Sequence, residues 1–459
     1  MAPSNQVEVI EFCKIAPPPH SVAPASLPLT FFDLIWLPYP PQQFLYFYEF
    51  PHPLTHFTHT LLPRIKHSLS LTLLHFYPFA GNLSWPEESP NPMVHYKDGD
   101  SVSLTVAQFE GGFHRFSGNQ ARESKESHSL HPQLSVSGSA IPVLALQITV
   151  FPNSGISFGF SFHHSIADAR TLTHFINSWA SICKLGKPSL STESLPLYDR
   201  TLIKDPKGIE KIFMNQLAIF FRSESGERRL SKVANYSRAS NAVRTTFQLS
   251  RADVARLKER ILAQHKKDKR SQPPRLSTFT VVCAYVWVCL VQSGDERIHF
   301  LINVDCRSRL DPSVPWTYFG NCIGNRVVKA ERDDLLEHDA IAKAAKLIEE
   351  KTKQLEKGIF DGAEFWLSHI LSAGADPKFG AAGSNHLGFY EADFGWGRPK
   401  KVELVSIDRS GLLFIAENPN DRGGAEISLT LEKHEMDVFS SMFCNGLSAG
   451  GNTSKYSRL

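Results

Sequence analysis

Hydrophobic and polar positions alternate over residues 156–162, and apolar residues then recur three and four positions apart over residues 169–184. The first pattern predicts a strand with one buried face, and the second predicts an amphipathic helix. Residues 163–168, His-His-Ser-Ile-Ala-Asp, therefore stand at a strand-to-helix turn. Because such turns present side chains at the rim of a sheet, His164 and Asp168 are candidates for chemistry.

The same two patterns predict the other elements. Strands are expected at 143–151, which forms a hairpin with 156–162, and at 243–249, 300–305, 401–407, 411–417 and 425–431. Helices are expected at 57–75, 209–222, 278–292, 339–357 and 433–443, with another opened by Ser250. Residues 27–50, dense in aromatics and Pro, are interpreted as a segment that lines a cavity or crosses a surface. Residues after 447 are expected to lack regular structure.

Length and composition predict more than one domain. The chain has 459 residues, 42% of them hydrophobic and 32 of them Phe, which implies a large aromatic interior. The patterns loosen over residues 188–243, apart from one amphipathic helix. We interpret this segment as a crossover between an N-terminal domain at 1–187 and a C-terminal domain at 244–459.

Charge and cysteine content exclude several functional classes. With 49 basic and 46 acidic residues, the net charge of +3 gives no argument for a nucleic acid or a membrane surface as partner. No apolar run approaches the ~20 residues of a membrane span, and Glu8 and Glu11 interrupt any signal-peptide pattern. The seven Cys form no CxxC pair, which favours reduced thiols and a cytoplasmic location. The final Ser457-Arg458-Leu459 resembles a peroxisomal address.

His164 is the strongest candidate for a general base. A neutral imidazole accepts a proton near pH 7, and no Gly-x-Ser-x-Gly elbow or catalytic Cys setting accompanies it. Asp168, one helical turn further on, can orient the imidazole as in a triad or pair with an Arg and hold the turn. A metal site built from His163, His164 and Asp168 is the competing interpretation, but neighbouring residues at a strand end point to opposite faces.

Two further stretches supply candidate residues. In Asp393-Phe-Gly-Trp-Gly397, glycines beside an aromatic residue allow a tight backbone path, and the Trp396 indole can donate to a ligand. A structural turn is the competing interpretation for Asp393 and Gly395. Arg307 is a candidate partner for a buried carboxylate, because a guanidinium group can bind both carboxylate oxygens.

Together, His164-Ser-Ile-Ala-Asp168 and Asp393-Phe-Gly-Trp-Gly397 resemble the HxxxD and DFGWG motifs of the plant BAHD acyl-CoA-dependent acyltransferases. The two motifs stand 225 residues apart in the same order. Tyr318-Phe-Gly-Asn-Cys322 resembles a motif of the subgroup that acylates sugars on anthocyanins, flavonols and other phenolic glycosides. Agreement also extends to residues 28–33, 77–82, 198–200, 203–206 and 304–307, so the likeness runs from near residue 6 to about 447.

The resemblance implies roles for these residues. His164 is expected to deprotonate the acceptor hydroxyl, whose oxygen attacks the thioester carbonyl, and then to protonate the leaving thiolate. Asp168 is expected to point away and to fix the turn through a salt bridge with Arg307. His163 is expected to be structural.

The C-terminal half supplies supporting and binding residues in this interpretation. Asp393, Gly395 and Trp396 are expected to support the site, with Trp396 the best candidate for a contact near the CoA channel or the oxyanion. Ser277 and Thr278, which open the apolar helix, resemble a pantetheine or phosphate contact region, since helix N-termini bind phosphates. The basic cluster at 266–270 is a solvated loop or a contact for the CoA 3′-phosphate.

The implied fold is α/β, with two similar-sized chloramphenicol-acetyltransferase-like domains, each a mixed sheet with flanking helices. His164 is expected in a channel between them, with acyl-CoA entering one mouth as co-substrate and a phenolic glycoside entering the other. The resemblance implies no bound cofactor and a monomer.

Several alternatives remain open at this stage. The acyl group can be malonyl, with Arg170 a possible partner for its carboxylate, or hydroxycinnamoyl. The acceptor can be a non-glycosylated alcohol, and the chain can be an inactive binding protein on the same scaffold. A condensation-type domain also uses a His-His-x-x-x-Asp motif, but usually has Gly where this chain has Ala169, and it lacks DFGWG.

Overall fold

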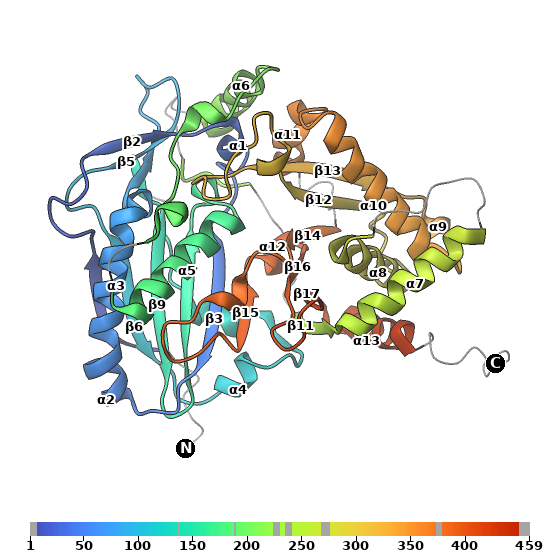
Figure 1. Cartoon of the computed structure of the whole chain (residues 1–459), viewed down its shortest axis with the longest axis horizontal. Coiled ribbons are helices and arrows are strands. Elements are labelled where there is room, and N and C mark those ends of the chain that lie inside the picture. Colours follow the sequence, from blue (N-terminus) through green and yellow to red (C-terminus); the bar gives the residue numbers. More distant parts are fainter. Residues whose placement is uncertain are drawn as a thin grey trace.

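The computed structural model describes residues 7–135, 138–187, 190–223, 230–234, 241–267, 276–372 and 379–448. Figure 1 shows two lobes, each built around a large sheet, with the first part of the chain mostly in one lobe and the last part mostly in the other. No helix in the described part of the chain is long and apolar enough to cross a membrane. The C-terminal Ser457-Arg458-Leu459 and most of the basic cluster at 266–270 lie outside the described residues.

The first lobe contains a six-stranded sheet in the order β1-β6-β9-β10-β3-β15. Its strands are β1 (Glu8–Ile15), β6 (Val102–Gln108), β9 (Leu144–Phe151), β10 (Gly155–Phe162), β3 (Gln42–Glu49) and β15 (Lys401–Leu404). β6 and β9 run parallel, and the other neighbours are antiparallel. The predicted hairpin of β9 and β10 is confirmed: Phe151 pairs with Gly155, and Asn153 adopts a positive φ of 59° at the turn.

Residues 42–49 correct an expectation of the sequence analysis. They form β3, an inner strand of this sheet with neighbours on both sides, not a segment at a cavity or surface. Nearly every side chain of β3 is buried, because Phe44, Tyr46 and Tyr48 pack in the main core while Leu45 and Phe47 pack in a second cluster on the opposite face. A strand covered on both faces loses the alternation that identifies a half-exposed strand.

Helices cover one face of the first sheet and a smaller sheet adjoins it. The principal helices are α3 (Leu62–His75) and α5 (Ala169–Leu185), which pack on each other (Figure 1). The helix expected at 57–75 begins as a π-turn at Phe57–Leu61. The smaller sheet has the order β2-β5-β4-β8, with β2 (Ala25–Pro28), β5 (Met93–Tyr96), β4 (Asn82–Ser84) and β8 (Ala140–Pro142).

The second lobe contains a seven-stranded mixed sheet in the order β13-β12-β14-β16-β17-β11-β7. Its strands are β13 (Ile323–Lys329), β12 (His299–Asp305), β14 (Phe379–Gly383), β16 (Leu413–Glu417), β17 (Ala425–Glu432), β11 (Ala242–Leu249) and β7 (Arg122–Glu123). Its long helices are α7 (Arg251–Lys267), α8 (Thr278–Gln292), α10 (Ala340–Lys357) and α13 (Lys433–Ser448). The helix α8 is buried on nearly all sides, as its uninterrupted apolar sequence predicts.

Shorter helices complete the fold. They are α1 (Phe31–Leu34), α2 (Leu54–His56), α4 (Phe113–Phe116), α6 (Ile209–Phe221), α9 (Arg332–Leu336), α11 (Trp366–Leu371) and α12 (Ile407–Ser410). The helix α6 lies in the segment 188–243 and packs against α1, so part of this crossover belongs to the core of the first lobe. The segment is therefore more than a connection between two cores.

The two sheets exchange strands. Figure 1 shows β15, from the last third of the chain, beside β3 in the first sheet, while β7, from the first third, pairs with β11 in the second sheet. A division of the sequence at 187 and 244 assigns most strands to one lobe, but it separates β15 and β7 from the sheets that they complete. The two lobes are thus joined by backbone pairing as well as by side chains.

A buried ionic network lies at this exchange. Arg244 of β11 donates to Asp408 of α12 at 2.6 Å and lies 3.5 Å from Glu403 of β15, which also pairs with Arg122 of β7. The side chains of all four residues are at most 2% exposed. Burial by itself would raise the pKa of Asp408. The guanidinium of Arg244 outweighs this effect and holds that pKa well below its usual value. Each charge therefore depends on its partners for the solvation that water would otherwise supply.

Replacing Arg244 with Met should lower the free energy of unfolding by about 3–5 kcal/mol, because two buried carboxylates lose a cation. Urea denaturation measures this loss. The matched control is Lys400→Met, which breaks the exposed pair with Glu49 and should cost less than about 1 kcal/mol. Equal losses in the two variants would show that the network does not hold the lobes together.

Candidate active site

The strand-to-helix turn predicted around His164 is confirmed. Strand β10 ends at Phe162, a short 3-10 turn spans His164–Ile166, and α5 begins at Ala169. Asp168 is the N-cap of α5: its carboxylate accepts a hydrogen bond from the amide of Thr171 at 2.9 Å. A carboxylate at this position satisfies one of the free amides at the helix start.

The His164 imidazole lies in an aromatic setting. Its ring stacks on Trp36 with a centroid distance of 4.0 Å and an interplanar angle of 6°, and Tyr39 meets it edge-on at 5.7 Å and 84°. Its Nδ1 atom is buried and has no hydrogen-bond partner within the described structure, although the residue as a whole keeps partial exposure. Desolvation lowers the pKa of His164 to about 4, opposed by its own carbonyl and by Asp168. The imidazole is therefore neutral at physiological pH.

His163 faces a different environment. It is 2% exposed, and its Nδ1 atom lies 2.8 Å from the Ser165 hydroxyl and accepts from the Ser165 amide at 3.3 Å. Burial lowers its pKa to about 4 as well. These contacts fit the structural role that the resemblance implied.

Asp168 binds Arg307 and leaves the imidazole of His164 without a carboxylate partner. Arg307 donates from Nη1 to Oδ2 at 2.8 Å and from Nη2 to Oδ1 at 3.2 Å, and the amide of Cys322 donates to Oδ2 at 3.0 Å. Asp168 and Arg307 are 1% and 3% exposed. Of the two roles left open for Asp168, the structure supports the arginine partner.

The geometry also disfavours the metal site. Within the described ranges, no group of three His, Cys, Asp or Glu side chains is arranged to hold an ion. The three residues of that hypothesis do not converge, because His163 bonds to Ser165 and Asp168 bonds to Arg307.

Asn321 and Asp33 hold the turn that carries His164 from the other side, and the sequence analysis assigned them no role. The Asn321 side chain donates to the carbonyl of His164 at 2.9 Å and to Asp33 at 3.0 Å. Asp33 is fully buried and also accepts from the amide and hydroxyl of Thr30 at 2.9 and 2.8 Å. Both residues lie in stretches quoted for the resemblance, which was the only signal that could have found them. Trp36 was missed because it lies three residues beyond the end of such a stretch.

The segment 393–397 forms a turn far from His164. Asp393 accepts from the amides of Gly395 and Gly397 at 2.8 and 3.1 Å and pairs with Lys184 at 2.6 Å. Gly395 has a φ of 110°, and a Cβ there would lie 2.6 Å from a guanidinium nitrogen of Arg64. The turn therefore requires glycine at this position.

Trp396 is partly buried and packs against the core beside that turn. Its ring stacks on Phe394 and Phe158 at 5.5 and 6.4 Å. Phe158 precedes His164 by six residues along an extended segment, a separation of ~20 Å. This placement supports a structural role and does not support the expected contact near the oxyanion.

Ser277 and Thr278 open α8 as expected. The Ser277 hydroxyl accepts from the amide of Thr280 at 3.0 Å and lies 2.8 Å from its hydroxyl. These bonds make Ser277 the cap of the helix. Contact of either residue with CoA stays a prediction.

Arg170 is already paired. Its Nε donates to Asp305 at 2.6 Å, and Asp305 also lies 3.2 Å from Arg307. Arg170 is thus engaged in the ion-pair cluster that holds the turn, which weakens the hypothesis that it binds a malonyl carboxylate.

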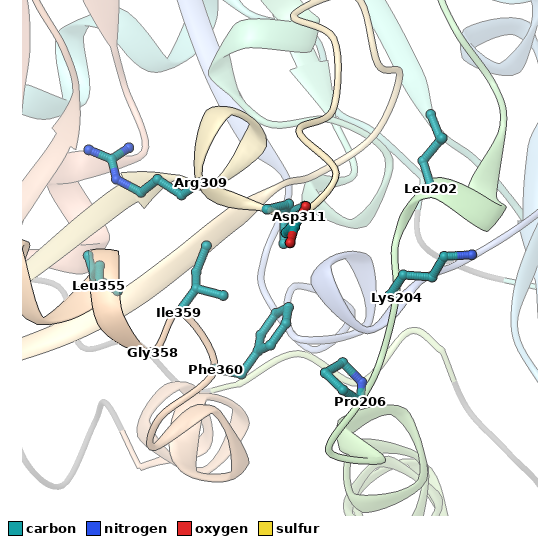
Figure 2. A pocket seen from close by; sticks show the side chains of 10 residues that line it. Leu202, Lys204, Pro206, Arg309, Asp311, Leu355, Gly358, Ile359 and Phe360 are labelled. Carbon is teal, nitrogen blue, oxygen red and sulfur yellow. The ribbon is translucent and has the colours of Figure 1, made fainter.

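A cavity of about 280 Å³ lies between the crossover and the second lobe. Figure 2 shows Leu202, Lys204 and Pro206 on one side, Arg309 and Ile359 on the other, and Asp311 and Phe360 between them. The Phe360 ring also contacts Phe31 of α1 at 5.6 Å, five residues before Trp36. One wall of the cavity therefore packs on α1.

Comparison with known proteins identifies the family. The family model described as the transferase family matches residues 5–445. The chain is 36% identical to the malonyl-coenzyme A:anthocyanin 3-O-glucoside-6''-O-malonyltransferase of Dahlia pinnata, over 96% of this chain and 97% of that protein. It is also 36% identical to phenolic glucoside malonyltransferase 2 of Arabidopsis thaliana, over 96% of this chain and 99% of that protein. The chain belongs to the BAHD acyltransferase family.

Other BAHD relatives use a different acyl group, and solved structures share the fold. The coumaroyl-CoA:anthocyanidin 3-O-glucoside-6''-O-coumaroyltransferase 2 of Arabidopsis thaliana is 35% identical, over 96% of this chain and 97% of that protein. Vinorine synthase aligns with a TM-score of 0.66 at 20% identity, covering 94% of this chain and 96% of that one. F. graminearum TRI101 complexed with coenzyme A and deoxynivalenol aligns with a TM-score of 0.68 at 16% identity, covering 91% of this chain and 97% of that one.

This BAHD protein is therefore an acyl-CoA-dependent O-acyltransferase with acyl-CoA as its co-substrate. The two-lobed α/β fold expected from the resemblance is confirmed. The assignment of catalytic and CoA-binding roles to individual residues stays a prediction.

Replacing Asp168 with Asn should lower the free energy of unfolding by about 3–5 kcal/mol, since buried Arg307 loses its main counter-charge. Acyl transfer should fall with it, because the turn that carries His164 shifts. Urea denaturation and an acyl-transfer assay measure the two effects.

The matched control is Asp305→Asn, which removes the second and more exposed carboxylate of Arg307 and the partner of Arg170. It should lower the free energy of unfolding less than Asp168→Asn does, because Asp305 is partly solvated. Comparable losses in the two variants would contradict a special role for the Asp168–Arg307 pair.

Proposed function

We propose that the enzyme transfers a malonyl or hydroxycinnamoyl group from acyl-CoA to a sugar hydroxyl of an anthocyanin, flavonoid or other phenolic glycoside, with His164 as the general base. The observation that carries the mechanism is a neutral imidazole, partly exposed, whose neighbouring carboxylate is committed to Arg307. Such a ring can take a proton at neutral pH and can return it in the same catalytic cycle.

The proton path uses the Nε2 atom of His164. Nδ1 is buried against the protein, which leaves Nε2 as the nitrogen that can face a substrate. As Nε2 takes the hydroxyl proton, the acceptor oxygen forms a bond to the thioester carbon and an oxyanion develops. The C–S bond then breaks, and the proton on Nε2 passes to the CoA thiolate. The atoms balance without a covalent enzyme intermediate.

The buried cysteines support direct transfer. Desolvation raises the pKa of Cys306 to about 12, and it raises that of Cys322, whose amide binds Asp168, well above the usual value. Both thiols therefore stay protonated at physiological pH and are poor nucleophiles. An acyl-cysteine intermediate is disfavoured at these two positions.

The substrate classes are proposed from the relatives. Proteins about 35% identical over nearly the whole length are named for malonyl and coumaroyl transfer to anthocyanin and phenolic glucosides. The cavity beside α1 has an apolar wall at Leu202, Ile359 and Phe360, with Lys204 and Arg309 at its edges (Figure 2). Apolar walls suit an aromatic ring, and cations suit a carboxylate or a phosphate.

The purified enzyme should acylate phenolic glucosides, and His164→Ala should reduce turnover by at least about 100-fold, the typical contribution of a general base. A panel of malonyl-CoA, coumaroyl-CoA and acetyl-CoA, offered with a flavonoid glucoside and with its aglycone, is analysed by product mass. Product mass identifies the donor, and the aglycone tests whether the sugar hydroxyl is the acceptor.

The control is circular dichroism of His164→Ala, which should match that of the unaltered enzyme because the side chain lies at a partly open site. Retained turnover in a folded His164→Ala protein would remove His164 as the base. Acylation of the aglycone alone would favour a non-glycosylated alcohol as the acceptor.

The pH dependence should reflect the lowered pKa of His164. The base works only in its neutral form, so kcat/KM should stay level on the acid side until about pH 5 and fall near pH 4, where burial places the pKa. Initial rates after brief exposure to each pH give this profile, with tryptophan fluorescence to verify folding. An acid limb near 6.5, the ordinary histidine value, would contradict a desolvated base.

A further inference from the structure

The proposed mechanism creates a positive charge that no carboxylate touches. When His164 takes the hydroxyl proton, its ring becomes an imidazolium cation in a desolvated site. Asp168 binds Arg307 and the Cys322 amide. Asp33, the other buried acid near the turn, binds Asn321 and Thr30. In a Ser-His-Asp triad, a carboxylate bonded to the far ring nitrogen stabilises this cation. Here Asp168 and the His164 carbonyl favour the charged ring without a carboxylate contact, so a further group that touches the ring can add to its stability.

Trp36 is in position to replace that carboxylate. Its ring lies parallel to the His164 imidazole, 4.0 Å away at an angle of 6°, so that the indole face covers the face of the imidazole. Trp36 is 5% exposed, which excludes most water from the contact. The face of an aromatic ring carries negative potential, and indole has the strongest attraction for a cation among the aromatic side chains.

The surrounding backbone holds Trp36 in this place. Its amide donates to the Asp33 carbonyl at 3.1 Å, and its carbonyl accepts from the Tyr39 amide at 3.0 Å. The Tyr39 ring packs edge-on against Trp36 at 5.6 Å and against His164 at 5.7 Å. Because Asp33 also binds the residue that holds the His164 carbonyl, Asn321, the indole and the imidazole are positioned by one bonded unit.

We propose that Trp36 is a positioning residue whose indole face stabilises the imidazolium of His164 during acyl transfer, in the role that a carboxylate has in other histidine-based sites. The proposal rests on His164 as the base. The proton balance is unchanged: Nε2 gains the hydroxyl proton and later gives it to the thiolate, and Trp36 exchanges no proton. Its contribution is larger for the cation than for the neutral ring, so it acts on the transition state.

The first test replaces the indole of Trp36 by a phenyl ring, which attracts a cation less strongly, or by an aliphatic side chain that has no ring. Trp36→Phe and Trp36→Leu should lower kcat progressively, over a range of about 2- to 30-fold expected for a desolvated cation–π contact. KM for acyl-CoA and for the glycoside should change by no more than about twofold, because the stabilised charge is absent from the ground state. Equal kcat values for all three proteins would overturn the proposal.

The acid limb of kcat/KM separates stabilisation of the cation from a merely structural effect. Loss of the indole face should make the imidazolium less stable, so the limb should stay near pH 4 or move lower. If Trp36 only excludes water, its removal hydrates the His164 imidazole, and the acid limb should move toward pH 6.5, the ordinary pKa of histidine. A movement toward 6.5 would overturn the proposal.

The decisive test leaves the shape of the side chain nearly unchanged. Incorporation of 5-fluoro-, 5,6-difluoro- and trifluorotryptophan removes negative potential from the indole face stepwise, so log kcat should fall in the same order. The Trp36 N–H is buried without a hydrogen-bond partner in the described structure. Fluorination makes that N–H a better donor, so a rise in kcat would instead indicate donation to a substrate oxygen and would overturn the proposal.

Two controls complete the design. The same fluorotryptophans in Trp36→Phe should leave kcat unchanged, because Trp36 is the tryptophan that stacks on His164. Trp316→Phe, which alters a tryptophan that is 51% exposed, should behave like the unaltered enzyme. If His164→Ala is inactive but kcat does not change across the fluorotryptophan series, only the role of Trp36 is refuted. If His164→Ala is active, the proposed base is refuted as well.

Discussion

The buried ion pair between Asp168 and Arg307 is the interaction on which the site depends. Asp168 begins α5 in the first lobe, and Arg307 follows β12 of the second-lobe sheet, so one bidentate contact joins the two lobes directly behind His164. Removing water from two charges is costly unless each finds geometry as good as this. The pair therefore specifies how the lobes meet, and with it the direction in which the turn with His164 faces.

Several other buried contacts cross between the lobes. β15 and β7 each complete the sheet of the other half of the chain, and the network around Arg244 neutralises the charges at that exchange. Asn321 reaches the carbonyl of His164 from a segment next to β13. Because this turn is held from both lobes, it can keep the polar ring of His164 in an apolar setting without collapse of the surrounding side chains. That setting in turn keeps the imidazole neutral.

Much of the fold could be predicted from the sequence wherever local patterning is strong. The β9–β10 hairpin, the helix α5 and the buried helix α8 follow their apolar periodicity closely. The strand β3 could not be found in this way, because both of its faces are buried and its alternation is lost. The exchange of β7 and β15 was equally hidden, because strands of two and four residues carry too little pattern to reveal their partners.

By itself, the sequence determined that His164 stands at the end of a strand, and its two motifs pointed to the acyl-CoA-dependent family. Both are matters of local order along the chain, which side-chain periodicity and motif spacing record directly. Only the tertiary structure decided that Asp168 faces Arg307, that Trp36 covers the imidazole, and that Trp396 packs on Phe158, away from His164. These contacts join residues that are more than a hundred positions apart. Their geometry depends on how two sheets pack, which no local pattern encodes.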